Sequence, residues 1–319
     1  MEIYKTQSTI ASRSNWLLSI IVIVLITIGV MIVMQGIGIL LINPLFSIPL
    51  DEMVSLFTGE SQHPNGRMAF LFVQGLGGGL AFFLAALVII KWVDKADIEW
   101  KQQIYNFRFT GLGLTLLVMV GGVLFNALLI DWNANVKFPE MLSGLEQVLK
   151  EKEEMAMGMT KFLTDFDNVG EFLMGLLVIG LLAGLGEEFL FRGVLQPKLH
   201  LYTGNAHIGI WLTALIFSAI HLQFYGFFPR MLLGAIFGYL YLYSGSLIYP
   251  IAAHIMNNAF TVILVYLNKL GKVNFDIEET DQVSISFALL GLLIMILGIK
   301  VFKEKNQQQR DNEKLAEGI

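Results

Sequence analysis

Six polar side chains lie in stretches of the sequence that are otherwise apolar enough to cross a lipid bilayer. An ionisable group near the bilayer centre costs about 2.5–3.5 kcal/mol on insertion scales, so it normally faces a bundle interior or a water-filled cavity and serves a function. Carboxylates, imidazoles and carboxamides are also groups that enzymes use to activate water and to bind an oxyanion. The sequence therefore points to an enzyme. The candidate residues are Glu187, Glu188, Arg192, His221, His254 and Asn258.

The two adjacent glutamates are expected to have different roles. Glu188 and Arg192 are four residues apart, so they share a helix face and can form an ion pair. Glu187 is rotated by about 100° from Glu188 and cannot share that geometry equally. A single buried pair would favour a network that only fixes helix packing. The second, unpaired glutamate beside it favours a general base, and we assign that role to Glu187.

The histidines follow the same spacing of four residues. Phe217 precedes His221 by one helical turn, so its ring can fix the orientation of the imidazole. His254 and Asn258 share a helix face, and both can donate hydrogen bonds to a developing oxyanion, at about 2.7–4 kcal/mol per donor. Each motif alone could equally serve as a contact between helices.

Together, these side chains offer every group that water needs to hydrolyse an amide. The reaction requires a base for the water, a group that orients it and donors for the tetrahedral oxyanion. Glu187, His221 and the His254–Asn258 pair supply one candidate for each role. The rival hypothesis is a non-catalytic membrane scaffold or transporter, in which the same side chains pack helices or line a solute path.

Composition limits the class of protein. The chain has 319 residues, of which 55% are hydrophobic and 15% charged, as expected for a polytopic membrane protein. The formal charge of −5 and the absence of a basic patch argue against a nucleic-acid partner. With no cysteine, the sequence excludes disulfides, thiolate zinc sites and a cysteine nucleophile.

The apolar segments predict an all-α transmembrane bundle of about eight spans, since a span needs about 20 apolar residues. The first segment is too long for a signal-peptide core, so we expect it to be an uncleaved span. The expected spans are Trp16–Ile42, Met68–Ile90, Gly111–Ile130, Gly170–Leu195, His207–Gln223, Met231–Tyr243, Leu247–Leu267 and Ile285–Val301.

The distribution of lysine and arginine predicts the orientation in the membrane. With the N-terminus inside, thirteen basic residues fall on the inner side and eight on the outer side, as expected for cytoplasmic loops. An even number of spans then places both termini in the cytoplasm of a multi-pass cell-membrane protein. We expect one structural domain, in which residues 1–169 hold three spans and a long outer loop, residues 170–302 the catalytic core and residues 303–319 a polar cytoplasmic tail.

The long outer connection, Asp131–Asn168, carries a helix signal of its own. Ser143-Gly144-Leu145-Glu146 has the pattern of a capping box and precedes an amphipathic run. The run could form an interfacial helix or a lid over the bundle, or it could be a solvated connector that is helical. Both interpretations stay open.

Small residues punctuate the spans, most densely at Gly75-Leu76-Gly77-Gly78-Gly79 and at Gly180, Gly184 and Gly186. Small residues in membrane helices allow close approach of neighbouring helices. A phosphate-binding loop would need a following Lys-Ser/Thr, which this sequence lacks. We therefore expect these glycines to serve helix packing.

Three of the motifs, in this order on successive spans, resemble those of the CPBP family of intramembrane proteases, also called the ABI or type II CAAX prenyl endopeptidase family. The resemblance covers about Gly170–Leu267, and the rest of the chain carries no motif that we recognise. The motifs are Glu187-Glu188-x-x-x-Arg192, Phe217-x-x-x-His221 and His254-x-x-x-Asn258.

This resemblance implies roles for the residues. Glu187 and His221 would activate the attacking water, His254 and Asn258 would form the oxyanion hole, and Glu188 and Arg192 would support the site. Implied partners are membrane lipid and a membrane-associated or lipidated peptide, which could be prenylated at a CAAX-type C-terminus.

No cofactor is certain from the sequence. The family has been described both as metalloproteases and as metal-independent glutamate proteases, so a divalent metal such as zinc stays open. Its candidate ligands are Glu187, His221 and His254. The chain has no His-Glu-x-x-His sequence, so the zinc-helix type of site is absent.

The expected spans leave one discrepancy in depth. Glu187 falls toward the cytoplasmic end of its span and His221 toward the outer end of the next. The rise of 1.5 Å per residue then separates them by roughly 10–15 Å. Tilt, a longer fourth helix that starts near Asp165 or a shifted fifth helix could bring the two residues level.

Overall fold

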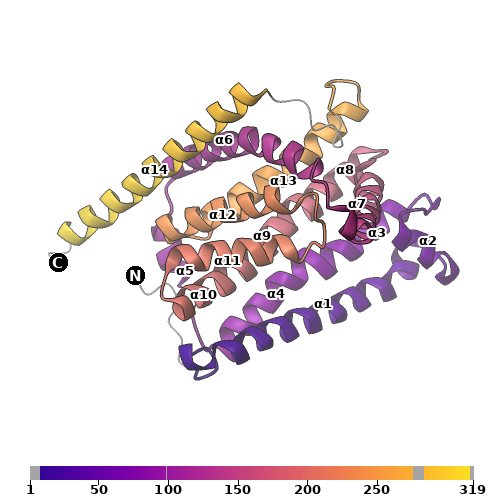
Figure 1. The fold of residues 1–319 in the computed structure, drawn as a ribbon. Coiled ribbons are helices and arrows are strands. Elements are labelled where there is room, and N and C mark those ends of the chain that lie inside the picture. The colour runs from indigo at the N-terminus through magenta and orange to yellow at the C-terminus, as the bar shows by residue number, and fades with distance from the viewer. Residues whose placement is uncertain (1–7, 98, 276–283, 317–319) are drawn as a thin grey trace.

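The chain forms a bundle of long helices packed side by side (Figure 1). The computed structural model describes residues 8–97, 99–275 and 284–316, and this part of the chain contains no strand. Several helices of the bundle are interrupted by π-helical turns. In chain order, the helices of the bundle are α1 (Trp16–Phe46), the run α3–η3–α4–η4 (Gly66–Gln74, Gly75–Leu80, Ala81–Val88 and Ile89–Val93), α6 (Phe109–Ala134), the run α8–η6–α9–η7–α10 (Val169–Gly175, Leu176–Leu182, Ala183–Leu190, Phe191–Leu195 and Gln196–Thr203), α11 (Ala206–Ala219), α12 (Phe227–Ser244), α13 (Ile248–Lys269) and α14 (Ile285–Ala316).

These helices confirm the all-α polytopic bundle. Six of them are long and apolar enough to cross a membrane, and the other two expected segments form the 14-residue α11 and the 18-residue α12. Exposed apolar side chains such as Leu25 on α1, Leu116 on α6 and Leu293 on α14 cover the outside of the bundle. Such a surface suits lipid rather than water. The chain is an integral membrane protein.

The start of α1 and the end of α14 lie at the same end of the bundle (Figure 1), in agreement with an even number of crossings. The cytoplasmic location of that end stays a prediction. The predicted orientation depends on the number of basic residues in the cytoplasmic loops. Two of the residues counted there, Arg192 and Lys198, are fully buried, so fewer loop residues support the orientation than expected. Lys198 donates hydrogen bonds to Ser19 Oγ and Asp94 Oδ1, both at 2.7 Å. It therefore joins α10 to α1 and to the end of the second span.

The long connection folds into the expected helix, α7 (Ser143–Thr164), near α3 and α8 at the opposite end of the bundle (Figure 1). The predicted capping box is wrong. Ser143 lies inside the helix, and Glu146 accepts a hydrogen bond from the backbone N–H of Phe138 at 3.3 Å. A turn of 3₁₀-helix, Glu140–Leu142, directly precedes α7 and displaces the helix start by one residue from the capping pattern.

All the glycines predicted to serve helix packing except Gly78 face a neighbouring helix within 4 Å. A Cβ atom on Gly186 would lie 2.7 Å from the carbonyl carbon of Gly79, and a Cβ on Gly184 would lie 2.8 Å from Ile255 Cγ1. Gly186 thus brings α9 against η3, and Gly184 brings the same helix against α13. The contact at Gly184 places the helix of the glutamates beside the helix of His254.

We expect Gly186→Ala to lower the free energy of unfolding by about 1–3 kcal/mol or more, because the added methyl group meets a backbone rather than a flexible side chain. The matched control is Gly78→Ala, since a Cβ at Gly78 meets nothing within 4 Å. That change should be neutral or stabilising by up to about 1 kcal/mol, because alanine favours a helix. Tryptophan-fluorescence melts in detergent measure both, and equal effects of the two variants would contradict the packing argument.

Candidate active site

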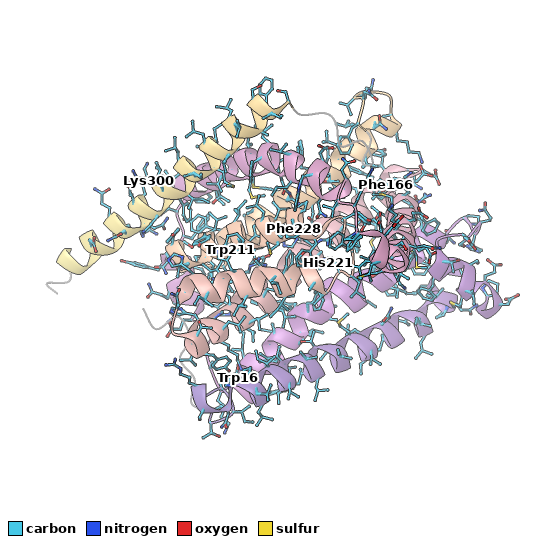
Figure 2. The ribbon with its side chains drawn as sticks, viewed as in Figure 1. Trp16, Phe166, Trp211, His221, Phe228 and Lys300 are labelled. Atoms are coloured by element: carbon cyan, nitrogen blue, oxygen red, sulfur yellow. The ribbon has the colours of Figure 1, made fainter. Side chains whose placement is uncertain are left out.

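The fourth helical run brings Glu187 and His221 to the same depth. The expected span ended at Leu195, but the helix continues through α10 to Thr203, and a hairpin turn at Gly204 leads into α11. Glu187 lies 16 residues before Thr203 and His221 lies 15 residues after Ala206, or about 24 and about 22 Å along their helices. Extension of the fourth helical run at its C-terminal end therefore accounts for the discrepancy in depth that the sequence left open. Figure 2 places His221 after α11, on the side of α7 and away from the chain termini.

Polar residues in α10 made this extension hard to see in the sequence. Gln196 donates a hydrogen bond to Gly238 O at 3.0 Å, and Lys198 pairs with Asp94, so both are buried with partners. Pro197 lacks an N–H for the helix, and the π-helical turn η7 lies directly before it. A wider turn at that point accommodates the proline without ending the helix.

Glu188 is the centre of a buried cluster. Its Oε1 atom accepts hydrogen bonds from Arg192 Nη1 and from His254 Nδ1, both at 2.8 Å, and the side chains of Glu188 and Arg192 have no exposed surface. Arg192 Nη2 also donates to Gly234 O on α12 at 2.6 Å. The predicted Glu188–Arg192 pair therefore forms, and its carboxylate binds the Nδ1 edge of the His254 ring.

Glu187 lies on the other side of the same imidazole. Its Oε2 atom is 3.9 Å from His254 Nε2, and 15% of its side-chain surface is exposed, against none for Glu188. Within the described ranges, no side chain or backbone group makes a hydrogen bond to Glu187. It is thus a carboxylate with exposed surface whose nearest charged group is the imidazole of His254, at ion-pair distance and beyond hydrogen-bond distance.

Aromatic rings connect the two histidines. The ring of Phe217 lies 5.4 Å from His221 and 5.9 Å from His254, and Phe237 stacks on His254 at 5.0 Å. The guanidinium of Arg192 lies 5.0 Å from the centre of the Phe217 ring and 5.3 Å from that of Phe237. These contacts surround the two imidazoles with apolar groups and restrict their rotation.

The backbone holds His221 more directly than the Phe217 ring does. His221 Nδ1 is 2.8 Å from Phe217 O. A carbonyl oxygen can only accept, so Nδ1 carries a proton and Nε2 of the neutral ring is an acceptor. The next residue, Leu222, has a φ of 56°, a left-handed conformation that is strained for leucine. His221 therefore lies at a constrained turn, as functional residues often do.

Asn258 keeps one donor for a ligand. Its Nδ2 atom donates to Ile179 O at 2.9 Å, in the π-helical turn η6, and its Oδ1 atom accepts from Asn257 Nδ2 at 3.2 Å. The Nδ2 group has two N–H bonds. The second remains available to bind an oxyanion.

The three candidate metal ligands do not form a compact cluster. In the described part of the chain, no three His, Cys, Asp or Glu side chains gather closely enough to hold a metal ion. His221 uses Nδ1 for Phe217 O and His254 uses Nδ1 for Glu188, so each ring presents Nε2, as a metal-bound histidine also would. No step of the mechanism below is routed through a metal.

The sequence interpretation missed a second layer of polar contacts around His221. Glu153 of α7 accepts hydrogen bonds from Gln223 Nε2 at 3.0 Å and from Tyr225 N at 3.3 Å. Gln223 Oε1 in turn accepts from Arg230 Nη2 at 2.9 Å. One residue could have indicated this network from the sequence. Arg230 is a charged residue at the fourth position of the otherwise apolar helix α12. The outer helix α7 is thus bound to the loop that carries His221.

Because Glu153 holds that loop, we expect Glu153→Ala to lower kcat/KM for the amide hydrolysis predicted from the sequence about tenfold, the loss of one to two hydrogen bonds to a charged group. The matched control is Glu154→Ala, which removes an exposed neighbouring carboxylate and should leave the rate unchanged. Steady-state kinetics give kcat/KM for the two variants. Equal rates would show that α7 has no influence on the site.

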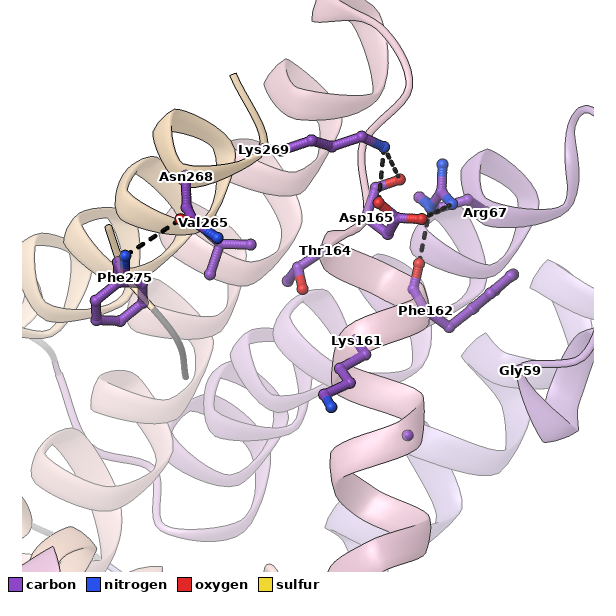
Figure 3. Close-up of a pocket in the computed structure, with 11 residues that line it drawn as sticks. Gly59, Arg67, Lys161, Phe162, Thr164, Asp165, Val265, Asn268, Lys269 and Phe275 are labelled. Carbon is purple, nitrogen blue, oxygen red and sulfur yellow. Dashed lines mark hydrogen bonds and ion pairs between the residues drawn. The ribbon is translucent and has the colours of Figure 1, made fainter. Parts of the chain in front are cut away.

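An open cavity of about 630 Å³ lies at the α7 end of the bundle, between α3, α7 and α13 (Figure 3). None of the predicted catalytic residues is among the described residues that line it. Its rim carries an ion-pair network in which Lys269 binds Asp165 at 2.7 Å and Asp167 at 2.9 Å. Arg67 binds Asp167 at 2.8 Å and Glu171 at 2.5 Å. The network ties these three helical runs together.

Hydrogen bonds from Arg67 and Lys269 lower the pKa of Asp167 from its ordinary value of 3.8 to about 2. A carboxyl group whose pKa is lower in the folded state stabilises the fold above its ordinary pKa, and this contribution is lost as the pH falls through the folded pKa. We therefore expect the wild-type melting midpoint to fall between about pH 4 and about pH 2 more steeply than that of Asp167→Asn. Parallel melting curves of the two proteins would contradict this.

Fold and site together define a polytopic helical membrane protein with a carboxylate–imidazole site inside the bundle. A family model described as type II CAAX prenyl endopeptidase Rce1-like matches residues 169–260, the segment that contains all three motifs. The chain is also 33% identical over 187 residues to the uncharacterized protein YpbD of Bacillus subtilis (strain 168). That alignment covers 56% of this chain and 81% of YpbD. No solved structure shows significant similarity.

The chain belongs to the CPBP family of type II CAAX prenyl endopeptidases, as its motifs predict. This is a family of CAAX-type intramembrane endopeptidases.

Proposed function

We propose that this protein is an intramembrane endopeptidase that hydrolyses a peptide bond in a membrane-tethered or lipidated substrate. The observation that carries the proposal is the asymmetry between the two glutamates. Glu188 Oε1 is bound by both Arg192 and His254, whereas Glu187 has exposed surface and no hydrogen bond among the described residues, and its Oε2 lies 3.9 Å from the other nitrogen of the same ring. A scaffold role would need only the first of these two carboxylates.

In this mechanism, Glu187 takes a proton from water while the acceptor nitrogen of His221 orients it. The resulting hydroxide adds to the scissile carbonyl carbon, and the oxyanion of the tetrahedral intermediate accepts hydrogen bonds from His254 and Asn258. The intermediate collapses with cleavage of the C–N bond, and Glu187 returns the proton to the leaving amine. Glu188 and Arg192 are positioning residues that hold His254.

The tautomer of His254 sets a condition on this scheme. Its Nδ1 atom faces the carboxylate of Glu188 and donates to it, so Nε2 can donate to an oxyanion only when the ring carries both protons. The carboxylate of Glu188, 2.8 Å from Nδ1, balances that positive charge while Glu187 holds the proton taken from water.

The apolar surroundings of the site suit a substrate that reaches it from the lipid, such as a prenylated peptide. We place the enzyme in the cell membrane as one structural domain with both termini cytoplasmic. The decisive assay uses purified protein in detergent with a quenched farnesyl-peptide, and compares the wild type with His221→Ala in the presence and absence of a chelator. Cleavage that requires His221 and survives chelation supports the proposal. Equal cleavage by both proteins, or none by the wild type, contradicts it.

A further inference from the structure

Two carboxylates of α7 face the protein. Glu153 accepts hydrogen bonds from the Gln223 side chain at 3.0 Å and from the backbone N–H of Tyr225 at 3.3 Å, in the loop that follows His221. Glu146 accepts from a backbone N–H of the connection that leads into the helix. Polar contacts thus bind one face of α7 to the loop of His221.

An apolar stripe runs along another face of the same helix, because residues spaced by seven and eleven positions share a face. Its C-terminal part is covered, since Met159 and Phe162 pack against the core cluster formed by α1, α2 and α3. Its N-terminal part, called the α7 stripe below, is largely uncovered. The side chains of the α7 stripe are 49%, 50% and 67% exposed at Leu145, Val148 and Met155.

The place of α7 in the bundle indicates what covers the α7 stripe. The helix runs across the bundle at the end away from the chain termini (Figure 1), and it is not among the described helices that are apolar enough to cross a membrane. A helix in the boundary between lipid chains and headgroups buries its apolar face by about 5–10 Å. Lys152, between Val148 and Met155 on the stripe, has a long side chain that can reach the headgroups with its ammonium group. Both features suit the lipid boundary.

Lipid-facing side chains reach the loop that α7 binds. Leu215, on the outer face of α11, is 45% exposed, and Leu222, in the loop held by Glu153, is 76% exposed. Such leucines are ordinary against lipid and form an unfavourable surface against water. Helix α7 therefore borders a surface that contacts lipid, and lipid is the partner that the α7 stripe fits.

We propose that the N-terminal half of α7 lies in the lipid boundary through Leu145, Val148 and Met155, and that it anchors the loop of His221 to the membrane surface through Glu153. Contact with lipid on one face of the helix then controls the position of a candidate site residue held by another face. The inference does not depend on the proposed function, because it concerns lipid contact and the order of a loop.

The chain has no cysteine, so one introduced cysteine carries a fluorophore at a single position. The test labels Val148→Cys and Met155→Cys with nitrobenzoxadiazole in nanodiscs of phosphatidylethanolamine and phosphatidylglycerol. The matched controls are the adjacent exposed positions, Gln147→Cys and Glu154→Cys. The two stripe labels should emit at shorter wavelength than the controls. They should lose most of their emission to lipids with nitroxide on the acyl chain and little to aqueous iodide, and the controls should show the reverse.

Three results would overturn the lipid contact. They are an equal response at all four positions, stripe labels quenched by iodide alone, and stripe labels protected from both quenchers. The third result would mean that a protein surface covers the α7 stripe.

Hydrogen–deuterium exchange in the same nanodiscs tests the anchoring. Met155→Glu places a charge on the α7 stripe, so the backbone amides of residues 221–226 should exchange several times faster than in the wild type. Glu153→Ala should have the same effect, because it removes the hydrogen bonds to the loop. Glu154→Gln changes the neighbouring exposed residue and should leave exchange unchanged. Equal exchange in Met155→Glu and the wild type would overturn the anchoring, and neither measurement requires peptide cleavage.

Discussion

Glu187→Gln should lower kcat for peptide cleavage by about 10²–10⁴-fold, the contribution of a general base, with little change in KM. Glutamine matches glutamate in size but cannot take a proton from water. Because Glu187 has accessible surface and no hydrogen-bond partner in the described part of the chain, the change leaves no buried group unpaired. The melting midpoint should therefore stay near that of the wild type. Initial rates with the farnesyl-peptide and tryptophan-fluorescence melts measure the two quantities.

The matched control for this variant is the neighbouring residue. Glu188→Gln removes the charge that binds both Arg192 and His254, so it should lower the melting midpoint as well as the rate. A comparison of the two variants separates an effect on the reaction rate from an effect on the stability of the fold. If Glu187→Gln kept the wild-type rate, or if it lost stability as Glu188→Gln does, Glu187 would not be the base.

Arg192→Met should produce the largest loss of stability, about 3–5 kcal/mol, because it leaves a fully buried carboxylate without its cation. The variant also loses the hydrogen bond to Gly234 O and the contacts of the guanidinium with Phe217 and Phe237. Equilibrium unfolding in mixed detergent micelles, followed by tryptophan fluorescence, gives the free energy.

Two comparisons test the reason for that loss. The double variant Glu188→Met/Arg192→Met removes both charges and should be more stable than Arg192→Met alone, although inactive, because no charge stays buried and unpaired. Lys300→Met breaks an exposed pair of the same spacing, Lys300–Glu304 at 4.0 Å, and should cost about 0–1 kcal/mol. Equal losses at the buried and exposed pairs would contradict the argument from burial.

The depth of Glu187 and His221 illustrates where sequence reasoning fails. Gln196, Pro197 and Lys198 interrupt the apolar run, so the sequence indicates a loop after Leu195. The structure instead buries the two polar side chains with partners on α12 and on the second span, and the helix continues to Thr203. Those partners are more than 40 residues away in the sequence, and no local pattern reveals them.

By itself, the sequence determined the helical class, the apolar segments and the pairs spaced by four residues, Glu188 with Arg192 and Phe217 with His221. These features are local, because the period of a helix and the apolar length of a span are set by neighbouring residues. Only the tertiary structure decided that Glu188 makes the hydrogen bond to His254 while Glu187 lies 3.9 Å from the other ring nitrogen, and that Arg230 Nη1 has no hydrogen-bond partner among the described residues. Both depend on how α9, α12 and α13 pack against one another, and that packing is fixed by contacts such as those of Gly184 and Gly186 between segments distant in the chain.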